Sequence, residues 1–173
     1  MTLSHTIIFE TKRLIVRRFT DHDKDNFFLL SGNASVMQYI RPVNTKEESD
    51  KFLLENIDAY AKNPCGGRWA VLEKLNQKFG GSFAIIPMPS HPDRTQLGYS
   101  LLPENWGRGF ATELTRAGLD YFMKNYIADE IYGVTEIPNT ASQKVLLKAG
   151  FRQVDSFMEN DKELLLFVVK RDG

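Results

Sequence analysis

Several features that would place a protein in a specialised class are scarce in this sequence. The only cysteine is Cys65, so an internal disulfide framework is excluded and a reducing, cytoplasmic location is expected. The three histidines, His5, His22 and His91, lie far apart without the paired spacing of zinc ligands, so we expect no metal. No apolar run approaches the roughly 18–20 residues of a membrane span, and the N-terminus lacks a signal-peptide pattern. We therefore expect no membrane partner and no export signal.

The chain also lacks an excess of charge of either sign. It has 22 basic and 22 acidic residues and a formal net charge of zero, which argues against nucleic acid as a partner. Hydrophobic residues make up 42% and charged residues 25%, values ordinary for globular proteins, so disordered and fibrous classes are excluded. Because there are no internal repeats and no linker, we expect a single domain covering residues 1–173, with a substantial core.

Hydrophobic periodicity predicts strands interspersed with helices. Strands are expected at residues 7–19, with an irregularity near Thr11 and Lys12, and at residues 68–75, 78–86, 96–102, 130–135, 151–157 and 164–169. A short helix is expected to end at residues 31–33, with one more turn at residues 36–40, and further helices are expected at residues 45–62, after Gly109 and at residues 140–149. Gly80 and Gly81 inside a strand indicate a bulge or a close backbone approach, and Gly118 in the long helix indicates close packing on the sheet.

The most informative stretch is residues 97–113, which reads as a strand, a glycine-punctuated turn and a helix of about five turns. Such a turn presents free backbone N–H groups at the positive end of a helix, which suits a phosphate or pyrophosphate. Gly107-Arg108-Gly109 alone is equally compatible with a tight connection that binds nothing. A dinucleotide fingerprint would need glycine at Thr112, and a P-loop consensus is absent, so both of those interpretations fail.

Four segments carry a resemblance to a known family: residues 11–17 (TKRLIVR), 97–99 (LGY), 106–113 (WGRGFATE) and 139–151 (NTASQKVLLKAGF). In this order and at these distances they resemble the GCN5-related N-acetyltransferase (GNAT) superfamily, most closely the branch containing the ribosomal-protein N-terminal (Rim-type) acetyltransferases. The resemblance covers nearly everything from residue 7 to residue 170. It implies the α/β GNAT fold, a central mixed, mostly antiparallel sheet of about seven strands flanked by about four helices, with a splayed acetyl-CoA cleft in the middle.

The resemblance also implies how the coenzyme is bound. The family signature Gln/Arg-x-x-Gly-x-Gly/Ala falls on residues 106–111, with tryptophan at its first position, a departure typical of this branch. Residues 107–112 are expected to offer N–H groups to the pyrophosphate, and residues 100–102 to pair with pantetheine and polarise the thioester carbonyl. Phosphate contact and solvation are equally compatible with the side chain of Arg108. The expected cofactor-binding residues are Ser100, Leu101, Leu102, Trp106, Gly107, Arg108, Gly109, Phe110, Ala111, Thr112, Asn139 and Ser142.

The expected catalytic residues are Ser142 and Glu136. Many family members use a tyrosine as the acid at the position of Leu146 here, which leaves Ser142, the alternative proposed for this branch, as the acid, with a bound water able to share the role. Asn139 and Ser142 match family positions that contact pantetheine or the thiol, and Asn139 would also cap a helix. Glu136 is the first candidate for a base and Glu104 the second, although either could be a surface carboxylate and positioning alone could supply most of the acceleration.

The activity implied is acetyl-CoA-dependent transfer of an acetyl group to a primary amine, by direct attack on the thioester. The alternative is a coenzyme A-binding regulatory or non-catalytic module on the same fold, which an intact glycine loop does not exclude. Protein N-termini, polyamines, amino-sugar antibiotics and small metabolites all remain possible acceptors. The acceptor is expected to contact the first two helices, the loop near Arg41 and Pro42, and the turn joining the last two strands. A monomer and a homodimer are both compatible with the sequence.

Overall fold

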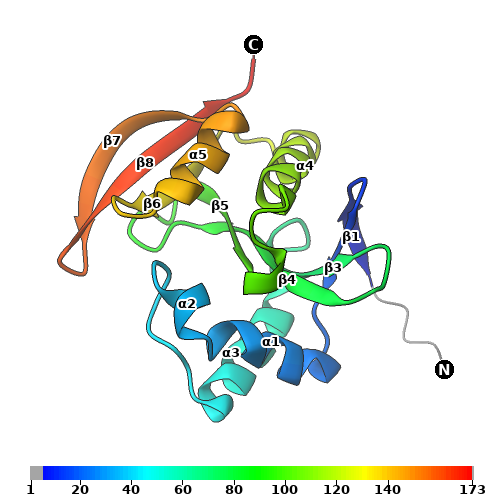
Figure 1. The fold of residues 1–173 in the computed structure, drawn as a ribbon. Helices are drawn as coiled ribbons and strands as arrows, with labels where there is room; N and C mark the ends of the chain where they lie inside the picture. Colours follow the sequence, from blue (N-terminus) through cyan, green and yellow to red (C-terminus); the bar gives the residue numbers. More distant parts are fainter. Residues whose placement is uncertain (1–5, 173) are drawn as a thin grey trace.

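The computed structural model describes residues 6–172, which form an open eight-stranded sheet and five α-helices (Figure 1). The strands are β1 (Ile7–Glu10), β2 (Leu14–Arg18), β3 (Gly67–Glu73), β4 (Phe79–Pro87), β5 (Thr95–Leu101), β6 (Glu130–Glu136), β7 (Arg152–Glu159) and β8 (Lys162–Lys170). The helices are α1 (Lys24–Ser31), α2 (Ala34–Met37), α3 (Lys46–Ala59), α4 (Phe110–Asn125) and α5 (Thr140–Lys148), with short 3-10 helices η1 (Asp21–Asp23) and η2 (Pro103–Asn105).

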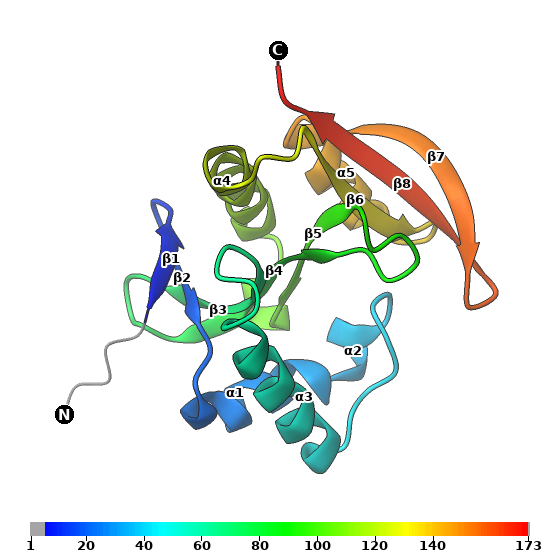
Figure 2. The ribbon, with the colours of Figure 1, turned by 180° about the vertical axis from the view of Figure 1, so that it is seen from behind.

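The sheet has the strand order β1-β2-β3-β4-β5-β6-β8-β7, and all neighbours are antiparallel except β5 and β6. Helices α1, α2 and α3 gather on one face of the sheet, and α4 and α5 lie on the other (Figures 1 and 2). Within residues 6–172, none of the helices combines the length and the apolar character needed to cross a bilayer. The expected α/β class and the splayed, mostly antiparallel sheet are confirmed.

The number of strands is eight rather than about seven because the strand expected at residues 7–19 is two strands joined by a turn. The hydroxyl of Thr11 accepts a hydrogen bond from the Leu14 N–H at 2.9 Å, and the Thr11 N–H donates to the Leu14 carbonyl at 2.9 Å. These bonds reverse the chain, so β1 and β2 pair with each other as an antiparallel hairpin.

There are five α-helices rather than about four because the extra turn expected after the first helix forms a separate short helix, α2. Helix α1 ends at Ser31, and the side chain of Asn33 then accepts hydrogen bonds from the N–H groups of Ser35 and Val36. This N-cap starts the single turn of α2 two residues earlier than the turn expected at residue 36. The extra break directs the following loop toward the centre of the sheet (Figure 1).

Helix α4 packs closely against the sheet, as the glycine in its buried face predicted. A Cβ atom at Gly118 would lie 2.1 Å from Cζ of Phe83, so only glycine leaves room for that ring. Phe83, Trp69, Leu114 and Phe122 are fully buried in the resulting core. The rigid contact between α4 and the sheet fixes the direction in which the N-terminus of the helix points.

Gly80 and Gly81 produce both features that the sequence suggested. The pairing of β3 with β4 shifts register between Val71 and Leu72, which is a bulge at this point of the strand. A Cβ atom at Gly81 would lie 2.2 Å from the carbonyl oxygen of Ser100, so β4 approaches the backbone of β5 closely. Both expectations are confirmed, and the close approach holds β5 against β4 along its whole length.

The layer formed by α1–α3 is anchored to the sheet by a buried ion pair. The guanidinium group of Arg17, on β2, donates to both carboxylate oxygens of Asp23 at 2.8 and 2.9 Å, and the N–H of Thr20 donates to the same carboxylate. Burial alone would raise the pKa of Asp23, but these hydrogen bonds outweigh it and the pKa is lowered. The pair therefore stays charged at neutral pH and fixes the start of the helical layer.

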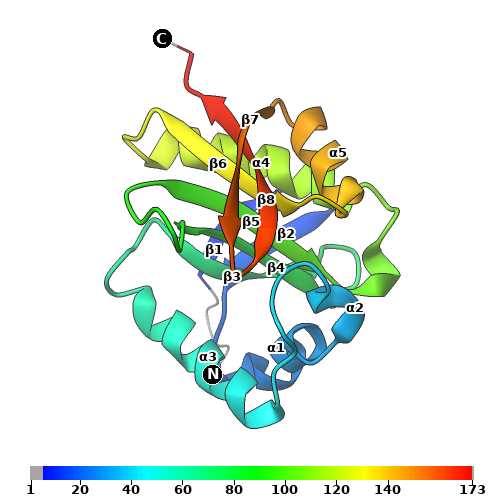
Figure 3. The ribbon, with the colours of Figure 1, turned by 90° about the vertical axis from the view of Figure 1, so that its left-hand side faces the viewer.

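The two strands at the centre of the sheet separate almost immediately. Strand β5 meets β6 through one paired position, Gln96 with Tyr132, whereas β4 pairs with β5, and β8 with β6, along most of their lengths. Figure 3 looks onto the sheet from its β7–β8 side, with α1–α3 below β5 and α5 above it. The divergence of β5 and β6 positions the site described next.

Candidate active site

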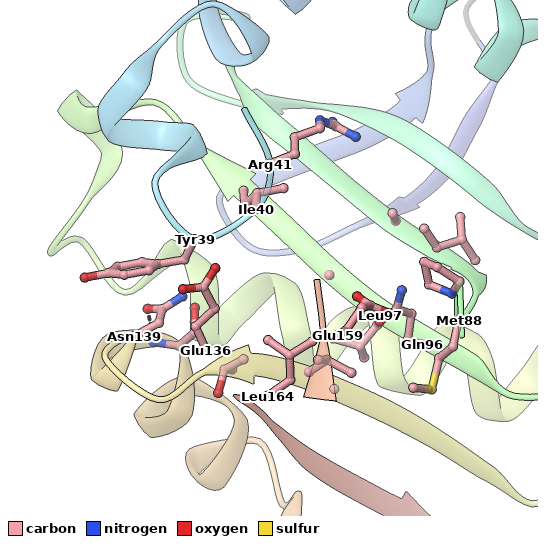
Figure 4. A pocket seen from close by; sticks show the side chains of 18 of the residues that line it. Tyr39, Ile40, Arg41, Met88, Gln96, Leu97, Glu136, Asn139, Glu159 and Leu164 are labelled. Atoms are coloured by element: carbon pink, nitrogen blue, oxygen red, sulfur yellow. Dashed lines mark hydrogen bonds between the residues drawn. The ribbon is translucent and has the colours of Figure 1, made fainter. Parts of the chain in front are cut away.

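A cavity of about 590 Å³ lies where β5 and β6 diverge. Its inner part is formed by β5, β6 and the first turns of α5 (Figure 4). Its outer part is formed by the loop after α2, by β3 and β4, and by the hairpin of β7 and β8. The cavity is within the 300–1,000 Å³ range typical of small-molecule sites.

The loop before α4 exposes backbone N–H groups beyond the end of β5, and none of residues 101–113 lines this cavity. Gly107 and Gly109 have φ angles of +71° and +78°, a conformation that favours glycine, and none of the side chains in the described residues caps the helix at Gly109. The first helical bond runs from the Glu113 N–H to the Gly109 carbonyl, so the N–H groups of residues 110–112 have no acceptor within the helix. This end of α4 therefore fits a pyrophosphate, as the sequence suggested.

The turn between β1 and β2 clamps that loop in place. Arg13 donates from its guanidinium group to the Arg108 carbonyl at 2.9 Å and forms an ion pair with Glu113 at 2.7 Å. The hydroxyl of Thr11 donates to the same Glu113 carboxylate at 2.6 Å. Two sequence segments that are about a hundred residues apart, 11–17 and 106–113, thus form one unit.

Two expected cofactor residues have other partners in this structure. The guanidinium group of Arg108 forms an ion pair with Glu73 at 2.5 Å and donates to Asn105 at 3.0 Å. The indole N–H of Trp106 donates to the Leu101 carbonyl at 2.8 Å while half of the residue stays exposed. Arg108 would have to exchange or share Glu73 to reach a phosphate, so the backbone of the loop is the better phosphate ligand.

The backbone of β5 offers alternate residues to the cleft. The Leu102 N–H already donates to the Gly80 carbonyl at 2.9 Å, on the β4 side of the strand. Since N–H directions alternate along a strand, Ser100 also faces β4, whereas Tyr99 and Leu101 face β6. Of the expected residues 100–102, Leu101 has its main-chain groups on the β6 side, where its carbonyl already accepts the Trp106 indole N–H, and Ser100 is the one that lines the cavity.

Ser142 meets a partner that the sequence did not identify, the side chain of Tyr99. The two hydroxyl groups share a hydrogen bond of 3.1 Å, and Asn139 holds the start of α5 by accepting from the Ser142 N–H at 3.3 Å. Burial raises the pKa of Tyr99 above its usual value of about 10, and the hydrogen bond to Ser142 offsets part of that rise. Leu146 is buried beside the cavity. The LGY segment of residues 97–99 contains this tyrosine, but its resemblance to the family does not by itself indicate a role for the Tyr99 side chain.

The two candidate bases are placed very differently. Glu136 lines the cavity (Figure 4), where its carboxylate forms an ion pair with Lys162 at 2.7 Å. Glu104 is exposed on η2 and does not line the cavity. In the part of the chain that the structure describes, no group of three or more His, Cys, Asp or Glu side chains could hold a metal ion.

The regions expected to meet the acceptor border the outer part of the cavity. The lining includes Tyr39, Arg41 and Pro42 from the loop after α2, and Glu159 and Asn160 from the β7–β8 hairpin. Arg68, on β3, also lines this part and was not singled out from the sequence. Arg68 follows Gly67 and precedes Trp69 in β3, and no sequence motif there indicates that its side chain faces a cavity.

Comparisons with known proteins agree with this geometry. Residues 13–152 match the family model described as an acetyltransferase (GNAT) domain. The uncharacterized N-acetyltransferase YoaA of Bacillus subtilis (strain 168) is 29% identical over 147 residues, which are 84% of this chain and 83% of YoaA.

Solved structures share the fold. An acetyltransferase (GNAT family) from Bacillus anthracis has a TM-score of 0.80 at 21% identity, covering 93% of this chain and 96% of its own. The ribosomal-protein alpha-N-acetyltransferase RimL in complex with coenzyme A has a TM-score of 0.80 at 16% identity, covering 96% and 98%. The family and the enzyme class expected from the sequence are confirmed: the chain belongs to the GNAT acetyltransferase family, as an N-acetyltransferase.

Proposed function

We propose that this enzyme transfers the acetyl group of acetyl-CoA to a primary amine, on a protein N-terminus or a small molecule, within one domain. The observation that carries the proposal is the opening of the sheet between β5 and β6, with a 590 Å³ cavity that reaches from the hydroxyl groups of Tyr99 and Ser142 to the loop after α2. Such an opening admits two ligands that meet inside the sheet.

Acetyl-CoA supplies an activated acetyl thioester, and the chain supplies its binding surface. The N–H groups of residues 107–112 bind the pyrophosphate, since the positive φ angles of Gly107 and Gly109 turn the backbone toward the ligand. The clamp from Arg13 keeps the loop in this conformation. Trp106 contributes its exposed face, and Phe110 is buried beneath the loop.

The edge of β5 aligns the pantetheine and the thioester. The main-chain groups of Tyr99 and Leu101 bind an extended ligand in the way a neighbouring strand would. An N–H group at this edge polarises the thioester carbonyl and stabilises the negative charge that develops on its oxygen. Asn139 keeps α5 in register so that Ser142 faces the sulfur.

The chemistry requires one bond to form and one to break. The amine nitrogen attacks the carbonyl carbon, the C–N bond forms, the C–S bond breaks, and the thiolate takes a proton. Ser142 and Tyr99 deliver that proton, with Tyr99 as the stronger acid of the pair and protonated throughout the neutral range. The proton lost by the amine passes to water or to Glu136, which must first exchange its ion pair with Lys162.

If the acceptor is a chain N-terminus, an appreciable fraction of its amino group is already unprotonated at neutral pH, so it needs little help from a general base. An α-amino group has a pKa of about 7.7–8.0 and a lysine about 10.4. Positioning of the amine against the thioester then supplies most of the acceleration. A dedicated base is therefore dispensable for an acceptor of low pKa.

The test is release of free thiol from acetyl-CoA in the presence of a panel of amines, with mass spectrometry of the products. We expect thiol release that depends on the amine and an acetylated amine as the product, with little release when no amine is present. Calorimetry that shows acetyl-CoA binding but no turnover with any amine would favour the non-catalytic coenzyme A-binding module instead. Absence of both binding and turnover would contradict the proposal.

A further inference from the structure

Two arginine side chains meet at the outer end of the cavity. Arg41 comes from the loop after α2 and Arg68 from β3, and both line the cavity. Their guanidinium carbons lie 4.4 and 5.8 Å from the centre of the same aromatic ring, that of Phe52 on α3. Figure 4 shows the Arg41 side chain extending from its loop over the strands of the sheet. The result is two like charges around one apolar ring.

Neither charge is neutralised within residues 6–172. Arg41 and Arg68 form no ion pair with any carboxylate of that part of the chain, and the Nε atom of each is buried without a hydrogen-bond acceptor. Burial lowers the pKa of Arg41, and burial together with the Arg41 charge lowers the pKa of Arg68 to about 10. Both remain protonated at neutral pH, so the structure maintains two unsatisfied cations side by side, which is unfavourable unless an anion joins them.

Three other arginines have carboxylate partners, whereas Arg18, like Arg41 and Arg68, forms no ion pair within residues 6–172 and has a buried Nε without an acceptor. Arg13 pairs with Glu113, Arg17 with Asp23, and Arg108 with Glu73. The two carboxylates that line the cavity form no ion pair with Arg41 or Arg68. Glu136 is paired with Lys162, and Glu159 is paired with neither arginine. The carboxylates that line the cavity thus leave Arg41 and Arg68 available for an anion at the place where a second substrate would lie.

The sheet beneath the arginines leaves a path to the reacting end of the cavity. Arg68, Ala84 and Gly98 are paired neighbours across β3, β4 and β5, and all three line the cavity. Two strand spacings separate Arg68 from β5 by roughly 10 Å between backbones. Ala84 carries only a methyl group, and nothing lies within 4 Å of the position that a Cβ on Gly98 would occupy. A small molecule can therefore reach from the guanidinium groups to the opening between β5 and β6.

We propose that the acceptor is a small primary amine that also carries an oxyanion, a carboxylate or a phosphate, and that Arg41 and Arg68 bind this oxyanion while the amine faces the thioester. The inference rests on the proposed acetyl transfer and names the substrate class of the same site. The two guanidinium groups line the cavity, where they attract the oxyanion and offer it charge-assisted hydrogen bonds. Polyamines and amino-sugar antibiotics are disfavoured as acceptors because their cationic groups would meet two uncompensated positive charges.

Matched pairs of amines test this assignment by kinetics. To test the carboxylate, kcat/KM is compared between phenylalanine and 2-phenylethylamine. To test the phosphate, it is compared between phosphoethanolamine and ethanolamine. Each kcat/KM is corrected for the fraction of the amine that is unprotonated. We expect kcat/KM to be at least about tenfold higher for one of the anionic members. Arg41→Gln and Arg68→Gln should each lower, by about tenfold, the ratio of kcat/KM between that member and its partner without the anionic group. Arg152→Gln, on the exposed edge of β7 and outside the cavity, is the matched control.

Equal rates within both pairs, or an anionic preference that survives both substitutions, would overturn the assignment. A second measurement does not depend on turnover: the side-chain Nε–H signals are recorded by nitrogen-15 NMR while inorganic phosphate or acetate is added, with saturating coenzyme A and without it. Arg41→Lys and Arg68→Lys identify the two signals. Saturating shifts of both signals support the anion site, and unchanged signals overturn it. If the two arginine signals shift with phosphate or acetate but acetyl-CoA does not bind, the anion site is supported and the proposed acetyl transfer is contradicted.

Discussion

The two halves of the cleft, one proposed for the acetyl donor and one for the acceptor, differ in whether main-chain groups or side chains form them. The half that we propose binds acetyl-CoA, the donor half, consists mainly of main-chain groups: the N–H groups at the start of α4, in a loop shaped by Gly107 and Gly109, and the free edge of β5. The acceptor half consists of side chains from several separate elements, among them Arg41, Arg68 and the β7–β8 hairpin. The turn of the donor half follows from local sequence, although Arg13 holds it from a distant strand, whereas the acceptor half depends entirely on the packing of distant elements.

This difference separates what must stay constant from what can vary. The donor half binds through groups that every residue has, so its sequence requirements are for small residues and for positive φ angles. The acceptor half can change its ligand by replacing one side chain, without moving the sheet. Three sets of substitutions would break or sharpen the contrast, and they follow in order of expected effect.

The largest effect is expected from Gly109→Val in the donor half. A β-branched side chain at a φ of +78° strains the loop and turns the N–H groups of α4 away from the pyrophosphate. We expect acetyl-CoA binding to fall below detection in calorimetry. Gly150→Ala is the control, because Gly150 also has a positive φ, +98°, with nothing within 4 Å of its would-be Cβ, but lies at the C-terminal end of α5. Unchanged affinity in Gly109→Val would contradict the assignment of the loop.

The next effect concerns the layer that carries the acceptor half. Asp23→Ala leaves Arg17 buried without its partner, which should reduce the free energy of unfolding by about 3–5 kcal/mol in urea denaturation. Asp50→Ala, which breaks the half-exposed pair of Asp50 with Lys46, should cost no more than about 0.5 kcal/mol. Similar losses in the two variants would show that the buried pair does not anchor this layer.

The same carboxylate predicts acid sensitivity. Because the folded-state pKa of Asp23 is lowered from its ordinary value of 3.8, its stabilisation is complete above that pH and is lost as the pH falls through the lowered value. The Asp23→Ala protein should therefore lose less stability than the unmodified protein on acidification below about pH 4. An equal loss in both would exclude Asp23 as the source.

A smaller effect is expected where the two halves meet. Tyr99→Phe and Ser142→Ala should each lower kcat by about 10–100-fold while acetyl-CoA affinity changes by less than about threefold. Because the two hydroxyl groups act as a unit through one hydrogen bond, the double variant should be little worse than the poorer single variant.

The pH dependence of the rate identifies the acid within this pair. The raised pKa of Tyr99 keeps it protonated, so activity that depends on it should be lost only as the pH rises above about 10. In Tyr99→Phe that loss at high pH should disappear. A rate that falls with the same pKa in the variant would assign the proton donor elsewhere.

Much of the fold could be predicted because its determinants are local. The glycine loop, the long helix and the close contacts at Gly81 and Gly118 follow from residue types at single positions. The sequence indicates only an irregularity near Thr11 and Lys12, and not the hairpin of β1 and β2, because the hydroxyl of one residue, Thr11, reverses the chain there. The division of the first helical region at Asn33 was anticipated only loosely, since one capping side chain decides where α2 begins.

The local conformation could be predicted only where it depends on backbone. The glycine-punctuated turn expected before α4 is present, with positive φ angles at Gly107 and Gly109, and its binding of pyrophosphate stays a prediction. The contact of Tyr99 with Ser142 and the meeting of Arg41 with Arg68 depend on packing between elements that are far apart in the chain. Likewise, no local pattern reveals that Lys162 holds Glu136.

The single pairing of Gln96 with Tyr132 gives this sheet an unusual distribution of its edges. Most open sheets have unsatisfied ladder groups only along their two outer margins, where they invite adhesion between molecules. Here two further margins, those of β5 and β6, run through the interior of the protein, where other chains cannot reach them but a narrow, extended ligand can. The unpaired edges of β5 and β6 are therefore accessible to a narrow, extended ligand, and they are too enclosed to pair with the sheet of another folded molecule.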